Sequence, residues 1–134
     1  MEKCRSEAAR NGFIRTLLGR IRYLPGIHSS QAYVRSEAER AAGNHPIQGT
    51  AADIVKLWMR QLWKMLTAYG VNAKLISDPV LQVHDELILE FDEGQEQLID
   101  FMVKESLSEA VRELEFTVPI RCGGKWATTW GQLK

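Results

Sequence analysis

A long helical pattern in the middle of the chain constrains the fold most strongly. From Ile47 to Tyr69, apolar residues recur every three or four positions, as in a helix with one face against a core. The recurring positions are Ile47, Ala51, Ile54, Val55, Trp58, Leu62, Met65 and Leu66. The pattern predicts one amphipathic helix, with Gly70 as its C-terminal stop.

Upstream, this helical pattern is predicted to begin near Val34 or Ser36, because Ser36 with Glu39 fits a capping box. Pro46 lies inside it. Proline lacks a backbone donor, and its ring clashes with the carbonyl group four residues earlier. We therefore expect a kink or break near residues 43–45.

Shorter elements are predicted on both sides of this helix. Residues 2–11 are rich in helix formers and stop at Asn11-Gly12. Residues 13–24 favour a small hairpin that turns at Gly19. The N-terminal part of the chain is thus expected to contain a helix followed by two short strands.

The second half is predicted to combine strands with a helix. His84-Asp85 lies between two strand-like runs, 73–83 and 86–91, as their tight connection or as a strand edge. Residues 95–114 have the pattern of an amphipathic helix, and residues 116–123 that of a third strand, at an edge because it contains proline. The fold class is α+β, a small antiparallel sheet with a hairpin packed against long helices.

Composition matches an ordinary soluble globular domain, with 45% hydrophobic and 25% charged residues. No run of eighteen apolar residues is present, so no membrane span is predicted. Cys4 and Cys122 lie far apart, which excludes a CxxC site and indicates reduced thiols in a cytoplasmic compartment.

The zero net charge hides an asymmetry between the two halves. Residues 1–64 carry 11 Lys and Arg against 5 Asp and Glu, whereas residues 65–134 carry 6 against 12. A basic half favours a polyanionic partner such as nucleic acid, although many proteins show uneven charge without one.

The adjacent residues His84, Asp85 and Glu86 form the first candidate site. Neighbouring side chains on a strand point to opposite faces, so both carboxylates could bind one ion only if the backbone turns there. A carboxylate at a hairpin tip suits Mg²⁺, which takes one or two protein carboxylates plus substrate phosphates. By itself, a solvated acidic turn is the commoner explanation of such a triplet.

A second candidate site is the polar row, which we define as Arg40, Asn44 and Gln48. The three residues are spaced four apart and share one face if the helix persists past Pro46. All three donate hydrogen bonds, and the DNA minor groove offers acceptors at every base pair. The row could sense base pairing without reading sequence, while its arginine suits a phosphate. From spacing alone, a polar solvent-facing side is the simpler explanation.

The predicted N-terminal hairpin is basic, with Arg15, Arg20 and Arg22. Guanidinium groups bind phosphate through two hydrogen bonds, so Arg20 and Arg22 are candidate DNA-binding residues, and a solvated hairpin explains them equally well. No GxxxxGK[ST] loop and no GxSxG motif is present. Chemistry based on a phosphate-binding loop or on an acyl-serine therefore loses support.

Three segments of the chain together resemble family A DNA polymerases, the bacterial DNA polymerase I type also found in phages. They are TLLGRIRYLP, ERAAGNHPIQGTAADIVK and LQVHDELILE, in this order and at nearly the expected spacing. The resemblance covers essentially the whole chain. It implies the C-terminal portion of a palm domain, with a helix and basic hairpin over residues 1–34, a kinked helix over 35–70, and the His-Asp-Glu hairpin, a helix and an edge strand over 71–134.

The resemblance also implies roles for individual residues. Asp85, with Glu86 beside it, would bind the catalytic Mg²⁺ ions, and His84 would lie near the primer 3′ end. Gln48 would sense the terminal base pair from the minor groove. Arg40 and Asn44, its neighbours in the polar row, would contact the template strand.

The implied activity is template-directed transfer of nucleotides from dNTP to a primer 3′-hydroxyl by a two-metal mechanism, in DNA replication or repair. The implied partners are primer–template DNA, dNTP and the remaining parts of a longer polymerase, in the cytoplasm (nucleoid or phage-infected cell) and without a membrane. The family's other essential aspartate and its nucleotide-binding fingers residues are not found in this sequence. We therefore expect the isolated chain to be inactive.

Two other functions stay open from the residues alone. One is a non-catalytic DNA-binding module of the same fold, and the other is a metal-dependent nuclease that uses Asp85, Glu86 and Glu90. The segment ISDP, residues 76–79, departs from the family pattern and leaves the register of the second hairpin open.

Overall fold

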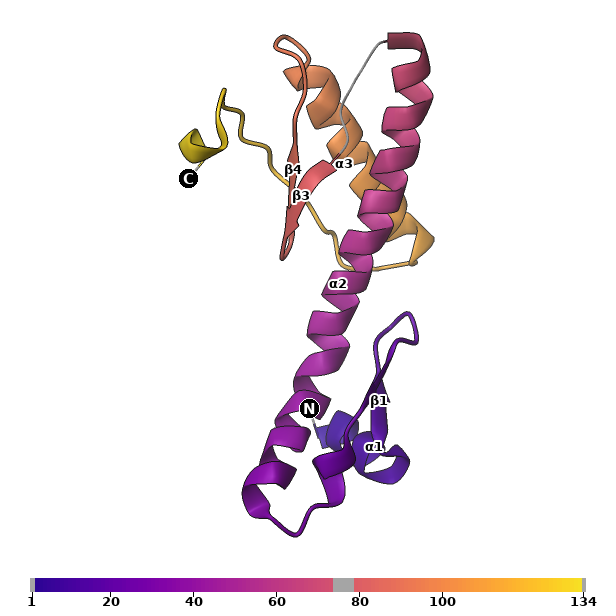
Figure 1. Cartoon of the computed structure of the whole chain (residues 1–134). Coiled ribbons are helices and arrows are strands. Elements are labelled where there is room, and N and C mark those ends of the chain that lie inside the picture. Colours follow the sequence, from indigo (N-terminus) through magenta and orange to yellow (C-terminus); the bar gives the residue numbers. More distant parts are fainter. Residues whose placement is uncertain (1, 74–78, 134) are drawn as a thin grey trace. The chain divides into compact units, whose positions relative to one another are not determined.

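The computed structural model describes residues 2–73 and 79–133, which divide into two compact units between Asp53 and Ile54. Helix α2, Ala32–Ala73, contributes residues to both units. Each unit has its own hairpin (Figure 1). Each also has its own buried residues. Among the described helices, none combines the length and the apolar character needed to cross a bilayer.

The first unit holds a helix and a hairpin that pack on the first turns of α2. Its other elements are α1, Glu2–Asn11, β1, Phe13–Arg15, β2, Ile21–Tyr23, and the 3-10 helix η1, Pro25–His28. Helix α1 ends as expected, because Gly12 adopts a φ of 74° that favours glycine. Gly19, with a φ of 83°, turns the chain between β1 and β2. Their antiparallel register pairs Phe13 with Tyr23, so the predicted hairpin is confirmed.

A small apolar core lies between the elements of the first unit. Helix α1 contacts β1, and the 3-10 helix lies near α1 (Figure 1). The buried apolar residues are Ala8, Ile14, Leu24, Ile27, Ala38 and Ala42. Half of these side chains are alanine, so this core contributes modestly to stability through apolar burial.

Helix α2 is longer than the sequence predicts at both ends. It begins at Ala32, so Ser36 lies inside the helix and the predicted capping box is wrong. It also continues past Gly70 to Ala73, and the predicted stop at that glycine is wrong. Tertiary packing overrides local end signals of this kind, because each of them is worth only about 1 kcal/mol.

Pro46 does not break α2, which is helical from residue 43 through residue 50. Proline removes one backbone hydrogen bond, and the other bonds of a 42-residue helix keep the turn closed. The carbonyl of Pro46 accepts a hydrogen bond from the Thr50 hydroxyl. The predicted break near residues 43–45 is therefore wrong.

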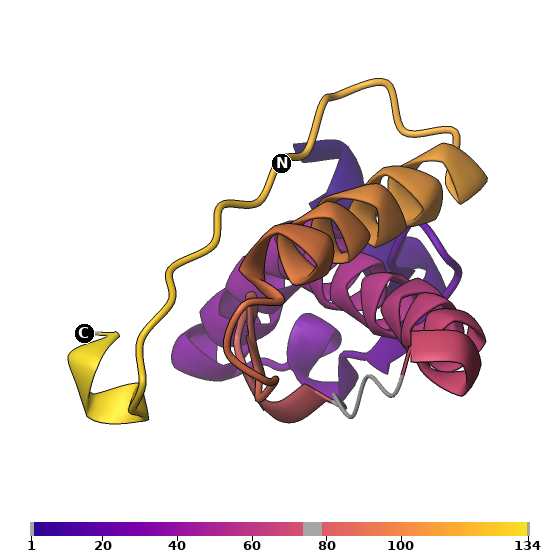
Figure 2. The same cartoon turned by 90° about the horizontal axis from the view of Figure 1, so that it is seen from above.

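The second unit is built on the apolar stripe of α2. Its other elements are β3, Pro79–Val83, β4, Glu86–Leu89, α3, Glu96–Glu113, and the 3-10 helix η2, Trp130–Gln132. Helix α3 lies alongside the later turns of α2 (Figure 2). Ile54, Trp58, Leu62 and Leu66 are buried as predicted, whereas Ile47, at 72% exposed, and Ala51, also exposed, do not belong to the buried stripe. The indole Nε1 of Trp58 donates to the Val103 carbonyl at 3.0 Å, which ties the two helices together.

Strands β3 and β4 form the predicted hairpin, connected by His84-Asp85. Their register runs from Leu81 opposite Ile88 to Val83 opposite Glu86, with an irregularity between Pro79 and Leu81. Ile76, Ser77 and Asp78 of the ISDP segment lie outside the described residues. The register next to the connection is thus regular.

The predicted third strand is wrong, since residues 116–123 have no regular secondary structure. Pro119 cannot donate to a strand ladder, and within the described part of the chain no strand pairs with this segment. The α+β class is confirmed, with two two-stranded antiparallel sheets and three α-helices over the described residues.

Candidate functional site

The His-Asp-Glu triplet lies at the tip of the β3–β4 hairpin, in the second unit. His84 and Asp85 form the connection, and Glu86 pairs with Val83 at the start of β4. His84 has a φ of 53°, a left-handed conformation that the tight reversal requires of its first residue. All three side chains of the triplet are exposed. The backbone does turn at Asp85, which meets the condition for two neighbouring carboxylates to serve one ion.

Apolar packing supports this tip from behind. Leu87 and Leu89 of β4 pack against the buried cluster that includes Leu62 and Met102. At the connection itself, the Gln82 side-chain amide donates to the His84 carbonyl at 2.8 Å. The acidic tip therefore projects from a strand held on the core.

The acidic tip offers part of a metal site. Within residues 2–73 and 79–133, no three His, Cys, Asp or Glu side chains gather closely enough to hold a metal ion. Mg²⁺ commonly takes one or two protein carboxylates and fills its other positions with water and phosphate oxygens. The donor set of Asp85 and Glu86 fits such a partial site.

Glu90 does not join these two carboxylates. It follows Glu86 by four residues along an extended strand, which separates the two backbones by about 13 Å. The arrangement thus gives no support to the nuclease trio of Asp85, Glu86 and Glu90.

The polar row lies on α2 in the first unit. Because the helix continues through Pro46, Arg40, Asn44 and Gln48 fall on one side of it, and all three are exposed. The geometric condition for a shared donor surface is met. Contact of the row with DNA is a prediction that the geometry permits.

The β1–β2 hairpin is fixed to α2 by a set of side chains of which only Arg20 was a candidate site residue from the sequence. The Thr16 hydroxyl donates to Oδ2 of Asp53 at 2.6 Å, and Nε of Arg20 donates to Oδ1 of Asp53 at 2.8 Å. The backbone N–H of Leu17 donates to the Thr50 hydroxyl at 3.0 Å. We call this set, Thr16, Arg20, Thr50 and Asp53, the hairpin dock. Asp53 is only 3% exposed, and both of its carboxylate oxygens accept hydrogen bonds from side chains of the hairpin.

A glycine allows the hairpin to approach the helix this closely. A Cβ atom on Gly49 would lie well inside van der Waals contact of Cγ2 of Thr16. His45, Gly49 and Asp53 are spaced four apart and share the side of α2 that meets the hairpin.

The three arginines of the β1–β2 hairpin have different surroundings. Arg20 forms an ion pair with Asp53, and Arg15 lies over the Phe13 ring at 5.1 Å. Arg22 is exposed. The DNA-binding roles of Arg20 and Arg22 stay predictions.

One sequence signal could have pointed to the hairpin dock. Asp53 is the only acidic residue between Arg40 and Ala73, a stretch that also contains Lys56, Arg60 and Lys64. A lone acid in such a basic segment indicates a specific partner, because Asp is a poor helix former.

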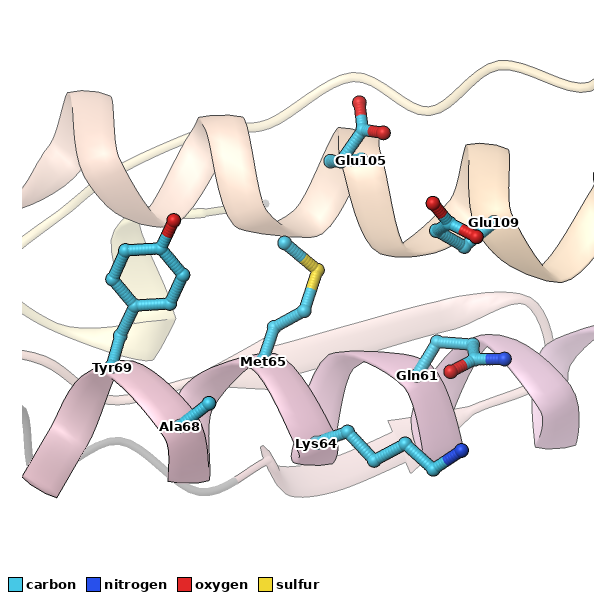
Figure 3. Close-up of a pocket in the computed structure, with 7 residues that line it drawn as sticks. All are labelled: Gln61, Lys64, Met65, Ala68, Tyr69, Glu105 and Glu109. Carbon is cyan, nitrogen blue, oxygen red and sulfur yellow. The ribbon is translucent and has the colours of Figure 1, made fainter.

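A groove of about 300 Å³ lies elsewhere on the second unit, between α2 and α3 (Figure 3). Tyr69 and Met65 of α2 lie across from Glu105 and Glu109 of α3. None of the residues predicted from the sequence to form a site lines it. The groove and the acidic tip are thus separate features.

Comparison with known proteins gives one consistent result. The model of DNA polymerase family A matches residues 1–132. DNA polymerase I of Bacillus caldotenax is 42% identical over 134 residues, which cover 100% of this chain and 14% of that protein. DNA polymerase I of Mycobacterium leprae is 42% identical over 125 residues, 93% of this chain and 13% of that protein.

A solved structure is similar as well. It is described as the POL domain of Pol1 from M. smegmatis in complex with DNA primer-template and dNTP. The match has a TM-score of 0.75 and 42% sequence identity, and it covers 81% of this chain and 18% of that one. This chain therefore spans 13–14% of the length of the two curated relatives, and on the match of the family model it belongs to DNA polymerase family A.

Proposed function

We propose that this chain forms part of the palm of a DNA-directed DNA polymerase and contributes half of its metal site. The observation that carries the proposal is Asp85, exposed at the turn of a hairpin whose second strand packs on the core. The similarity to a polymerase domain bound to primer–template and dNTP supports the same conclusion.

Asp85 and Glu86 would hold the Mg²⁺ ions together with a carboxylate from another part of the polymerase. When bound, such ions activate the primer 3′-hydroxyl and stabilise the negative charge that develops on the phosphates. The contribution of this chain is to keep the carboxylates still, through the packing of Leu87 and Leu89. His84, next in the connection, would lie against the primer 3′ end.

The polar row would bind the DNA duplex from its minor groove. Gln48 and Asn44 would donate to the minor-groove acceptors that every correct base pair offers, and Arg40 would bind a template phosphate. Because these acceptors are the same for all correct pairs, the row would check pairing geometry and leave the base sequence unread.

Primer extension by the polymerase that carries residues 1–134 tests the proposal. Asp85→Asn keeps the size of the side chain and removes its charge, and we expect extension to slow about 1,000-fold, or ~4 kcal/mol of activation free energy. The matched control is Asp92→Asn, an exposed aspartate beyond the end of β4, which should extend primers at the wild-type rate.

Other outcomes would point to other functions. If Asp85→Asn leaves extension intact, the tip is structural and the chain acts as a DNA-binding module. If residues 1–134 alone degrade DNA in the presence of Mg²⁺, the nuclease hypothesis is right. We expect the isolated chain to do neither synthesis nor degradation.

A further inference from the structure

The β1–β2 hairpin stands beside the polar row, and its place depends on one buried acid. We propose that Asp53 is a positioning residue for DNA, which holds the hairpin tip where the template strand binds. The proposal rests on the proposed function, because it requires the polar row to face DNA.

Asp53 cannot itself contact DNA. It is 3% exposed, and its two carboxylate oxygens accept hydrogen bonds from Thr16 and Arg20. Apart from the long-range effect of its charge, any influence of this residue on DNA must therefore pass through the hairpin.

The spacing along α2 places the hairpin next to the polar row. Successive residues of a helix are about 100° apart around its axis. Gly49, which contacts Thr16, directly follows Gln48, and His45, which lines the same side, directly follows Asn44. The hairpin thus forms a wall along one flank of the row.

The tip of this hairpin exposes apolar side chains that a partner could contact. Leu17 is 60% exposed and Leu18 is 47% exposed, although the backbone N–H of Leu17 is fixed to Thr50. Arg22 is exposed on the same hairpin. Exposed apolar side chains at the tip and a cation on the second strand of the hairpin suit the sugar and phosphate surface of a nucleic-acid strand.

Because Asp53 is charged, simple electrostatics and the positioning role predict opposite changes in DNA affinity when it is neutralised. Residues 1–64 carry a net charge of +6, from 11 basic and 5 acidic residues, and a polyanion should bind more tightly if one of those acids is neutralised. Positioning predicts the reverse, because neutralising Asp53 weakens its hold on Arg20 and Thr16. The direction of the change therefore separates simple electrostatics from positioning.

The first experiment measures the Kd for primer–template DNA in the polymerase that carries this chain, with Asp53→Asn. We expect a Kd about tenfold higher, or ~1.4 kcal/mol, and an unchanged extension rate at saturating DNA. The matched control is Glu37→Gln, which makes the same charge change at an exposed site on α2 and should bind as tightly as wild type or slightly more tightly. If Asp53→Asn also binds as tightly or more tightly, the proposal is wrong.

The second experiment moves the hairpin without touching Asp53. Gly49→Ala places a methyl group against Cγ2 of Thr16, so we expect DNA affinity to fall. Thr16→Ser removes that methyl group and keeps the hydroxyl that binds Asp53. The double variant should recover most of the lost affinity, and a double variant as weak as Gly49→Ala would overturn the proposal.

The two proposals fail in different ways. If the wild-type polymerase does not bind or extend primer–template, the proposed function is wrong. If the wild type does both and the variants do not follow this order, only the role of Asp53 is wrong.

Discussion

The two hairpins of this molecule are similar in size and are held in opposite ways. Thr16 and Arg20 of the first hairpin bind a buried carboxylate, and Thr50 binds the backbone of its tip. The second hairpin packs Leu87 and Leu89 of one strand on an apolar cluster. The first is attached by polar groups at its tip, in addition to the burial of Ile14 in its first strand, and the second by apolar groups behind its tip.

This difference suits two kinds of work. Directional hydrogen bonds at a tip specify one position, because a buried carboxylate without its donors is costly. Apolar packing at the base of a hairpin leaves the tip free for other partners. The second hairpin accordingly presents Asp85 and Glu86 to solvent, where a metal ion and phosphates could complete their coordination.

Removal of the apolar support should have the largest effect. Leu62 is completely buried in the cluster beneath β4, so Leu62→Ala should lower the free energy of unfolding by about 3 kcal/mol. Urea unfolding followed by tryptophan fluorescence is the measurement, because all four tryptophans follow residue 53 and report on the second unit. Leu18→Ala, at an exposed position of the first hairpin, is the control, and an equal loss in both variants would contradict the comparison.

Removal of the polar anchor should have an intermediate effect. Asp53→Ala leaves the buried Thr16 hydroxyl and half-exposed Arg20 without their acceptor, at a cost of about 2 kcal/mol. The loss should appear as faster hydrogen exchange in peptides from residues 13–23, above all at the N–H of Leu17. Glu37→Ala removes an exposed acid from the same helix and should leave that exchange unchanged. Slow exchange at Leu17 in the Asp53 variant would show that the polar groups are not the anchor.

The turn of the second hairpin should respond less strongly. His84 has a φ of 53°, which glycine adopts freely and a β-branched residue adopts only with strain. The free energy of unfolding of His84→Val, measured in urea, should therefore be about 1 kcal/mol lower than that of His84→Gly. Equal stabilities of the two variants would mean that the left-handed turn is not kept in solution.

The smallest expected effect concerns the ionisation of the Cys122 thiol in the second unit. Cys122 packs beside the cluster of Ile54, Trp58, Leu107 and Ala110, and burial raises the pKa of its thiol. Alkylation of Cys122 by iodoacetamide should reach its half-maximal rate at higher pH in the folded chain than in urea. Since the unfolded thiol ionises first, stability should fall slightly as the pH rises through the ordinary thiol pKa. Identical alkylation profiles in both states would contradict this burial.

Periodic patterns in the sequence predicted much of this fold. The spacing of Trp58, Leu62 and Leu66 identified the helix, because burial on one face leaves a trace every three or four residues. Turn residues located both hairpins, since Gly19 and His84-Asp85 lie at the two reversals. Local sequence patterns were therefore sufficient to identify the amphipathic helix and the two hairpin turns.

The wrong third strand and the missed hairpin dock both depend on distant partners. A strand over residues 116–123 needs a neighbouring strand to pair with, which a local pattern cannot supply. The fixing of Thr16 to Asp53 spans 37 positions, and neither residue carries a pattern that reveals the other. The polar row and the acidic tip were found as candidates from residue types, while the place of the first hairpin beside the row became visible only in three dimensions.

The hairpin dock also has a consequence for the order of folding. Its hydrogen bonds join residues 33 and 37 positions apart, whereas the turn of the hairpin closes within a few residues. The strands can pair within about 1–10 μs, but they find Thr50 and Asp53 in place only once that part of α2 is helical. A newly made chain would therefore carry a formed but undocked hairpin first, and the wall beside the polar row would be among the last surfaces to take shape.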